Sequence, residues 1–218
     1  MSIATLILGH SGHGKSTSMR NLKKEDAFVI QAWQKPLPFK NDWTYATKDN
    51  PDGNMFSTKS YGIIRQLVDG VVKAGKRKVI IIDDFQYLMS HEFMMKSAEK
   101  GFDKFTEMAK HVYDLVTYLC SLPEEYRVYI MCHIDDSSDG FQKMKTIGKL
   151  LDEKITPEGL FTIVLKSHKD DKYGFKTQTN GNDTVKSPID LFEKDFIDND
   201  LAFVDAQICD FYNIKWEN

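Results

Sequence analysis

The feature that most constrains this chain is a glycine-rich run, Gly9-His10-Ser11-Gly12-His13-Gly14-Lys15-Ser16, which follows an apolar stretch over residues 2–9. Its spacing matches G-x-x-x-x-G-K-[ST], the pattern of a loop that cradles phosphate groups. Glycines let the backbone curl so that several N–H groups face one phosphate, and a helix that follows adds its positive end. A strand-like run precedes the loop, and residues 12–22 have the pattern of a loop entering a helix. The sequence therefore predicts nucleotide-phosphate binding rather than a simple glycine-rich turn.

In such a loop the side chains at fixed positions have defined roles. The ammonium of Lys15, a predicted catalytic residue, is expected to reach the β- and γ-phosphates, and the Ser16 hydroxyl is expected to ligate Mg²⁺. The predicted cofactors are therefore ATP and Mg²⁺. His10 and His13 are expected to face solvent or a neighbouring subunit. The residues predicted to bind nucleotide are Gly9, His10, Ser11, Gly12, His13, Gly14, Lys15, Ser16 and Thr17.

Two carboxylates end a second apolar run, the Lys-Val-Ile-Ile-Ile-Asp-Asp sequence of residues 78–84. A continuous β-branched run is typical of a parallel strand that is buried on both faces. A carboxylate at the end of such a strand, beside the phosphate loop, can hold Mg²⁺, so Asp83 is the predicted metal partner together with Ser16. Asp84 is a candidate catalytic residue that orients the attacking water. The alternative is that Asp84 only caps the strand end.

A polar residue also ends the next hydrophobic strand, predicted over residues 127–133. His133 stands at this end, where a side chain could sense the γ-phosphate and act as a catalytic residue. A histidine that is merely satisfied at a strand terminus explains the position equally well, and both interpretations stay open.

Strands alternate with helices along the first 133 residues, which favours an α/β fold with a mainly parallel sheet flanked by helices. The chain shows neither an internal repeat nor a low-complexity segment, so one domain is predicted over residues 1–218. The predicted strands cover residues 2–9, 26–34, 78–84, 127–133, 160–166 and 172–178, the last two antiparallel, and the predicted helices cover residues 61–74, 102–119 and 200–211.

The net charge and the arginine content argue against two classes of function. A net charge of -3 is incompatible with a uniformly basic nucleic-acid coat, although it allows a local basic groove. A P-loop kinase usually closes an arginine-rich lid over its phosphates. This chain has only four arginines, and they are scattered, which disfavours a kinase. They are Arg20, Arg65, Arg77 and Arg127.

Cysteine usage and hydropathy indicate an intracellular protein. Cys120, Cys132 and Cys209 are odd in number and lie in apolar stretches, so buried free thiols are expected rather than disulfides. No apolar run approaches the about 18 residues that a membrane span needs, and no signal peptide is evident. We therefore expect no membrane partner.

Two segments combine aromatic residues with lysines. Residues 85–100 follow the Asp83–Asp84 pair and residues 134–158 follow His133. Aromatic rings can stack on bases while lysines contact phosphates, which suits single-stranded nucleic acid. The alternative is that the aromatic residues belong to the core and the lysines to a solvated face.

Together these motifs resemble the RecA superfamily, in particular small phage-encoded RecA-like ATPases that act as core-only single-strand annealing recombinases. The likeness covers nearly the whole chain and depends on the order of its motifs. The motifs are residues 9–17, 35–38 (Lys-Pro-Leu-Pro), 80–84, His133, 146–150 (Thr-Ile-Gly-Lys-Leu), 185–188 (Val-Lys-Ser-Pro) and 199–201 (Asn-Asp-Leu).

The resemblance implies a RecA-like P-loop core that binds ATP and Mg²⁺ and assembles into rings or filaments in the cytoplasm of a bacterial host. It implies single-stranded DNA as a partner of loops 85–100 and 134–158, with a single-strand-binding protein as a further partner. In RecA-like filaments a lysine near a late proline reaches the neighbouring ATP site. Lys186 matches that place and is a candidate catalytic residue in trans, against the alternative of an exposed loop lysine.

One departure from the family pattern leaves the general base open. RecA-like enzymes often carry a catalytic glutamate where this chain has Gln31, Trp33 and Gln34. Either Asp84 takes that role, or hydrolysis is slow. The primary hypothesis is a recombination ATPase acting on single-stranded DNA. The alternatives are a nucleotide-gated accessory or loader protein of a replication or packaging machine, and a small-molecule kinase.

Overall fold

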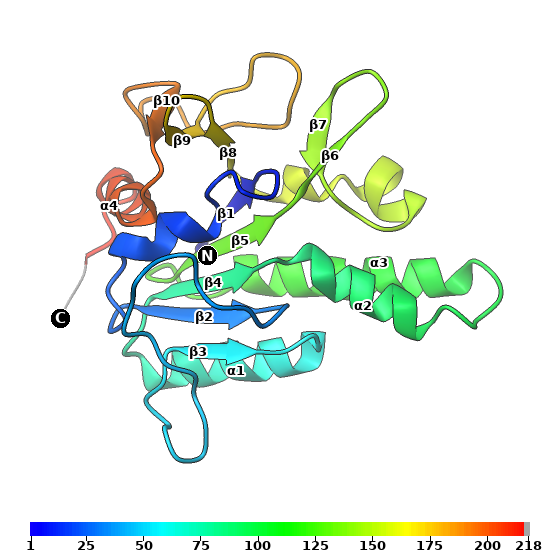
Figure 1. Cartoon of the computed structure of the whole chain (residues 1–218), viewed down its shortest axis with the longest axis horizontal. Coiled ribbons are helices and arrows are strands. Elements are labelled where there is room, and N and C mark those ends of the chain that lie inside the picture. Colours follow the sequence, from blue (N-terminus) through cyan, green and yellow to red (C-terminus); the bar gives the residue numbers. More distant parts are fainter. Residues whose placement is uncertain (216–218) are drawn as a thin grey trace.

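The computed structural model describes residues 1–215, which are built around an eight-stranded β-sheet in the order β10-β9-β8-β1-β5-β4-β2-β3 (Figure 1). The strands from β8 to β3 are parallel, and β9 and β10 continue the sheet in antiparallel fashion. This arrangement confirms the predicted α/β fold with a mainly parallel sheet, including its antiparallel strands near the C-terminal end. The strands are β1 (Ile3–Leu8), β2 (Ala27–Gln31), β3 (Met55–Ser57), β4 (Val79–Asp83), β5 (Arg127–Cys132), β8 (Ile163–Lys169), β9 (Tyr173–Lys176) and β10 (Phe196–Asp198).

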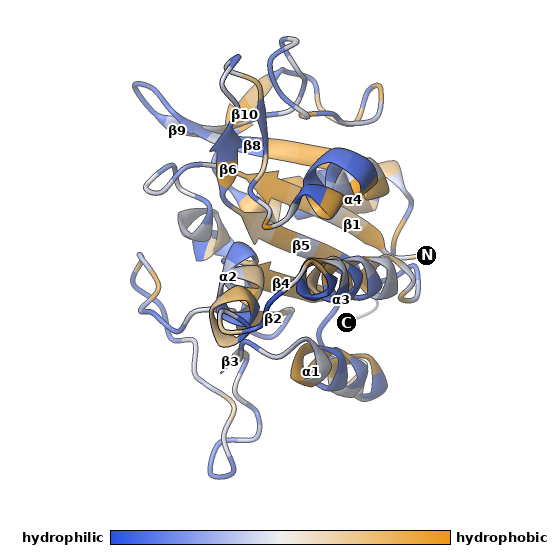
Figure 2. Ribbon diagram, turned by 90° about the vertical axis from the view of Figure 1, so that its right-hand side faces the viewer, coloured by the Kyte–Doolittle hydropathy of each residue, from blue (hydrophilic) through white to orange (hydrophobic). Residues whose placement is uncertain are grey.

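Alternate residues of the central strands enter two separate cores because side chains along a strand point to opposite faces. In β4, Ile80 and Ile82 pack into one core, whereas Val79 and Ile81 pack into the other. Both sets are fully buried, as the continuous apolar run predicts. Figure 2 shows the result as hydrophobic strands between helices that carry both hydrophobic and hydrophilic residues.

The helices begin and end where the sequence supplies caps. Ser60 accepts a hydrogen bond from the N–H of Ile63 at the start of α1, and Gly75 ends that helix with a φ of 69°. Asp200 caps α4 in the same way as Ser60 caps α1. Helices α1, α2 and α3 contribute to the first core, and α4 contributes to the second. The helices are α1 (Tyr61–Ala74), α2 (Gln86–Met95), α3 (Asp103–Cys120) and α4 (Leu201–Phe211).

Several local expectations differ from the structure. Residues 85–100, expected as a DNA-binding loop, contain α2, and the expected helix after the phosphate loop is the short 3₁₀ helix Ser16–Asn21. The polar segment 134–158 contains the hairpin of β6 (Ile134–Asp136) and β7 (Gln142–Met144), followed by a single π-helical stretch, Leu150–Ile155. These elements are three to ten residues long, so they carry little periodic signal.

The three cysteines are free thiols, as expected. Cys132 and Cys209 are buried and Cys120 is half-buried. Within residues 1–215 no helix combines the length and apolarity that crossing a bilayer requires.

A buried ion pair ties α4 to the sheet. The Arg127 guanidinium donates from Nε and Nη2 to the two carboxylate oxygens of Asp205, both at 3.0 Å, and the Tyr129 hydroxyl donates to the same carboxylate at 2.6 Å. Arg127 and Asp205 are at most 4% exposed. Bidentate geometry away from water makes this ion pair strong. Removing either partner would leave an uncompensated buried charge.

We expect Asp205→Ala to lower the free energy of unfolding by about 3–5 kcal/mol, because it removes the carboxylate that compensates a buried guanidinium. The measurement is urea unfolding followed by circular dichroism. Asp210→Ala, an exposed carboxylate on the same helix, is the matched control. Equal midpoints for the two variants would show that the ion pair contributes little.

Candidate active site

The phosphate loop connects β1 to the 3₁₀ helix and lies against β8. Gly12 and Gly14 adopt positive φ values of 78° and 93°, which favour glycine. Gly9 lies against β8, where a Cβ atom would meet Ser167 Cβ at 3.0 Å. The Ser167 hydroxyl donates to the carbonyl of His13. The loop is therefore curled and anchored as its spacing predicts.

The Lys15 side chain folds back over this loop. Its Nζ atom donates to the carbonyl oxygens of Gly9 at 2.6 Å and His10 at 3.0 Å, and the residue is 5% exposed. Burial lowers the pKa of Lys15, although the nearby Asp84 and Asp83 favour the charged form. A phosphate that engages this ammonium would replace uncharged carbonyl acceptors with an anion.

Asp83 lies against Ser16, as the sequence predicts. The Ser16 hydroxyl is 3.1 Å from both carboxylate oxygens of Asp83, although the two residues are far apart in the chain. Burial, followed by repulsion from Asp84, raises the pKa of Asp83 to about 6. A hydroxyl and a carboxylate are hard oxygen donors of the kind that Mg²⁺ prefers.

Asp84 adopts a φ of 59° and is 1% exposed. Its carboxylate pairs with the Lys35 ammonium, and its Oδ1 lies 3.7 Å from Nε2 of His133. Burial alone would raise the pKa of Asp84, but His133 and Lys35 outweigh burial, so this pKa lies below its usual value. Asp84 is thus an ionised carboxylate that lies between the Lys35 ammonium and the His133 imidazole.

These residues surround one cavity of about 570 Å³ at the carboxyl ends of the parallel strands. Most of the predicted loop residues line it, whereas Gly9, His13 and Asp83 do not. No arginine of the described residues lines it. The lining residues are His10, Ser11, Gly12, Gly14, Lys15, Ser16, Thr17, Lys35, Pro36, Pro38, Asp84, His133 and Tyr173.

The two loop histidines have different surroundings. His10 lies on the cavity wall with its Nε2 3.5 Å from Asp136, and its ring centroid is 5.3 Å from that of His13. Burial, with smaller contributions from His10 and His168, lowers the pKa of His13.

Lys186 is not brought to this cavity within the chain. Its N–H donates to the carbonyl of Val164 at 3.0 Å, and Val164 donates back at 2.8 Å, so Lys186 lies against β8. Any role of Lys186 at a nucleotide therefore concerns a neighbouring subunit.

Gln31, which stands where the family pattern often has a catalytic glutamate, has a structural role in this chain. Gln31 is fully buried and pairs with Asp83 in the sheet register. Its amide donates to the carbonyl of Lys35 at 3.1 Å and accepts a hydrogen bond from the Tyr45 hydroxyl. Gln31 is an uncharged amide with both of its polar groups engaged, whereas the Asp84 carboxylate lines the cavity.

The sequence alone predicts no role for three residues of the site. Lys35 stands in the Lys-Pro-Leu-Pro motif, but that motif indicates no chemical role for its side chain. Tyr173 lies beside Gly14 on the cavity wall. Asn199 is 3% exposed with both side-chain amide atoms unpartnered, and a Cβ on Gly14 would lie 3.1 Å from each. Asn199 begins the Asn-Asp-Leu motif of residues 199–201, but that motif indicates no role for the side chain because its neighbour Gly14 is distant in the chain.

The lysines of the two predicted DNA-binding segments are partly committed to ion pairs. Lys96 pairs with Glu92 and Glu107, and Lys143 lies 2.7 Å from Asp152. Lys145 lies 4.0 Å from Asp135. The aromatic residues divide as well, since Phe85 is fully buried whereas Tyr87 is 37% exposed.

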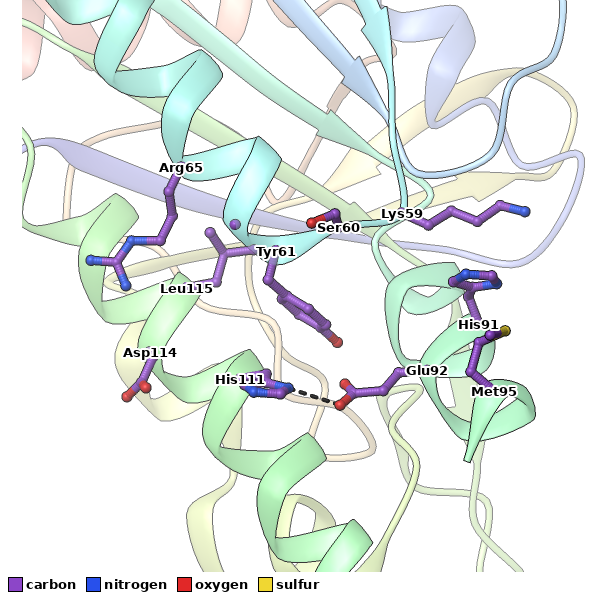
Figure 3. A pocket seen from close by; sticks show the side chains of 11 residues that line it. Lys59, Ser60, Tyr61, Arg65, His91, Glu92, Met95, His111, Asp114 and Leu115 are labelled. Atoms are coloured by element: carbon purple, nitrogen blue, oxygen red, sulfur yellow. Dashed lines mark hydrogen bonds and ion pairs between the residues drawn. The ribbon is translucent and has the colours of Figure 1, made fainter. Parts of the chain in front are cut away.

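A second cavity, of about 450 Å³, lies between α1, α2 and α3 (Figure 3). Glu92 of α2 and His111 of α3 meet there at 2.8 Å. Glu92, Glu107 and His111 present ligand atoms close enough together for one metal ion. Lys96 pairs with both carboxylates, so the cluster is held together by ion pairs without a metal.

This chain resembles solved structures, but it matches neither a family model nor a curated sequence. Among solved structures, it is similar to a KaiC-like protein of the hyperthermophilic archaeon Pyrococcus horikoshii. That similarity has 13% sequence identity and a TM-score of 0.43, and it covers 79% of this chain and 76% of the archaeal one.

Proposed function

We propose that this chain is a magnesium-dependent ATPase that binds single-stranded DNA as an oligomer and promotes annealing or strand exchange in phage recombination. One observation carries the ATPase part of the proposal. Lys15, the Ser16–Asp83 pair and the ionised Asp84 converge at one cavity around a curled phosphate loop. This combination provides a cation for phosphate, oxygen donors for a metal and a carboxylate for water.

The residues fit a magnesium ion. The Ser16 hydroxyl and the Asp83 carboxylate already meet at 3.1 Å, and Asp83 is fully buried with a raised pKa, as expected of a carboxylate that lacks a full cationic partner. Bound there, Mg²⁺ would neutralise phosphate charge. Ser16 and Asp83 would hold it, and Lys15 would orient the phosphates.

Lys35 links Asp84 to the bound nucleotide in this proposal. Its ammonium pairs with Asp84, yet its side chain is 41% exposed and lines the cavity. Burial lowers the pKa of Lys35, but the Asp84 hydrogen bond together with the negative charges of Asp83 and Asp84 outweighs burial, so this pKa lies above its usual value. A γ-phosphate in the cavity would compete with Asp84 for this ammonium. Asp84 would then be freed to accept a hydrogen bond from the attacking water.

The DNA part of the proposal is supported by the position of the two lysine-bearing segments. Both begin at the end of a strand that carries a site residue, since α2 follows Asp84 and the β6–β7 hairpin follows His133. A DNA strand bound to either segment would lie beside the nucleotide. A single-strand-binding protein is the natural further partner of such an activity.

One observation favours the alternative of a nucleotide-gated loader with weak ATPase activity. Gln31 stands in place of a catalytic glutamate, and Asp84 is occupied by Lys35. If Lys35 is not displaced by nucleotide, hydrolysis is slow and ATP serves to change the state of the protein.

The experiment that tests the proposal measures phosphate release with and without Mg²⁺ and a deoxythymidine oligonucleotide at low salt. We expect turnover to require Mg²⁺ and to rise with DNA, and DNA binding to weaken as salt increases. Binding that is absent at low salt, both with and without ATP, would discard the DNA function. Turnover that is slow and indifferent to bound DNA would favour the loader.

Oligomer formation is tested by light scattering with ATP and DNA each added or omitted. If Lys186 acts in trans, Lys186→Ala should bind nucleotide without turning it over. Mixing it with Lys15→Ala should restore part of the activity, because some interfaces then pair an intact loop with an intact Lys186. A mixture as inactive as its components would remove Lys186 from the site.

A further inference from the structure

Two exposed aromatic residues lie together at the carboxyl edge of the sheet, outside the nucleotide cavity. Trp33 is 50% exposed and Tyr87 is 37% exposed. Their ring centroids are 5.8 Å apart, and the Tyr87 ring is 6.3 Å from that of His133. Core packing does not account for rings this exposed, and neither Trp33 nor Tyr87 lines the cavity around Lys15. The pair is available to a second ligand.

A lysine adds positive charge to this pair. The Lys59 ammonium lies 4.2 Å from the centre of the Trp33 ring, and within residues 1–215 it forms no ion pair. Lys59 also lines the cavity between α1, α2 and α3, where Figure 3 shows it above His91. Aromatic faces beside a free ammonium can stack a base and contact its phosphate.

The carboxylates nearby do not oppose an anionic ligand. Asp84 is neutralised by Lys35, and Glu92 pairs with both His111 and Lys96. Asp114, on the far side of the same cavity, pairs with Lys110. Beside the Trp33 ring, Lys59 is therefore a cation that pairs with no carboxylate of the described residues.

The pair is linked through the backbone to the residue that carries the proposed catalytic carboxylate. The N–H of Tyr87 donates to the carbonyl of Asp84 at 2.9 Å. On the other side, Trp33 precedes Lys35 by two residues in the segment whose Ala32 N–H donates to the Asp83 carbonyl at 3.0 Å. Both rings therefore lie within three residues of the Lys35–Asp84 contact along the chain, so a ligand bound to them is placed to affect that contact.

We propose that Trp33 and Tyr87, with Lys59, form the site where bases of single-stranded DNA stack, and that this site couples DNA to the nucleotide. The inference rests on the proposed function and gives it a specific location. Trp33 and Lys59 lie outside the two segments that the sequence singled out, so the DNA contact extends to the segments that follow strands β2 and β3.

The test measures binding of a fluorescein-labelled deoxythymidine oligonucleotide at low salt with ATP. Trp33→Ala and Tyr87→Ala should each weaken binding by about tenfold or more, because an aromatic stacking partner is lost. Trp33→Phe, which keeps an aromatic face, should retain most of the affinity. Phe203→Ala is the control, since Phe203 is a 44% exposed aromatic residue on α4. Binding of a fluorescent ATP analogue should be unchanged in all four.

The outcomes separate the inference from the function on which it rests. If the wild-type protein binds DNA and both alanine variants bind it equally well, the stacking site is wrong and the DNA function stands. If the wild-type protein binds no DNA, both fall. DNA should also quench tryptophan fluorescence in the wild type but much less in Trp33→Phe. Quenching that depends on protein concentration without DNA would assign the rings to self-association and overturn the proposal.

Discussion

Lys15→Ala is expected to lower ATP turnover by about 100-fold or more, the cost of removing one charge-stabilising donor from a phosphate-transfer site. Lys15 is the one lysine buried in the phosphate loop, where its ammonium is held by the Gly9 and His10 carbonyls. The substitution removes the cation and leaves the glycine backbone intact. The measurement is phosphate release at saturating ATP with Mg²⁺.

Lys23→Ala is the matched control, because Lys23 is an exposed lysine just beyond the 3₁₀ helix. It should turn over ATP at the wild-type rate. Turnover by Lys15→Ala that equals the control would remove the phosphate-loop assignment altogether. Loss of thermal stability together with activity would be detected by circular dichroism of both variants.

Asp84→Asn has the second large expected effect. We expect turnover to fall by about 100-fold or more while nucleotide binding is kept, because loss of a positioned base typically costs that much. Asparagine is the appropriate replacement, since it tolerates the φ of 59° at this position and cannot carry the negative charge. The measurements are phosphate release and the affinity for a fluorescent ATP analogue.

Asp83→Asn is the comparison that separates the two carboxylates. It should raise the Mg²⁺ concentration needed for activity, because Asp83 and Ser16 are the proposed ligands of the metal. Asp84→Asn should leave the Mg²⁺ dependence of nucleotide binding alone. An Asp84→Asn protein with wild-type turnover would mean that Asp84 only caps β4 and that the base lies elsewhere.

Much of the fold was predictable because its strongest signals are local. The strand over residues 78–84 follows from a continuous β-branched run, and the helix over residues 61–74 follows from apolar residues spaced along one helical face. The short elements β3, β6, β7 and β10 were missed, because three residues carry almost no periodic pattern. Residues 85–100 were expected to form a loop, yet Leu88 and Met89 pack into the core and favour helix α2.

The same distinction between local signals and tertiary packing applies to the candidate site. By itself, the sequence determined the phosphate loop, the strand that ends in Asp83 and Asp84, and the α/β class, since each depends on residues adjacent in the chain. Only the tertiary structure decided which partners these residues meet. Asp84 meets Lys35 and His133, and Trp33 meets Tyr87 and Lys59, because the sheet order brings the ends of β2, β4 and β5 to one edge. Strand order is set by the burial of two whole cores, which no short stretch of sequence encodes.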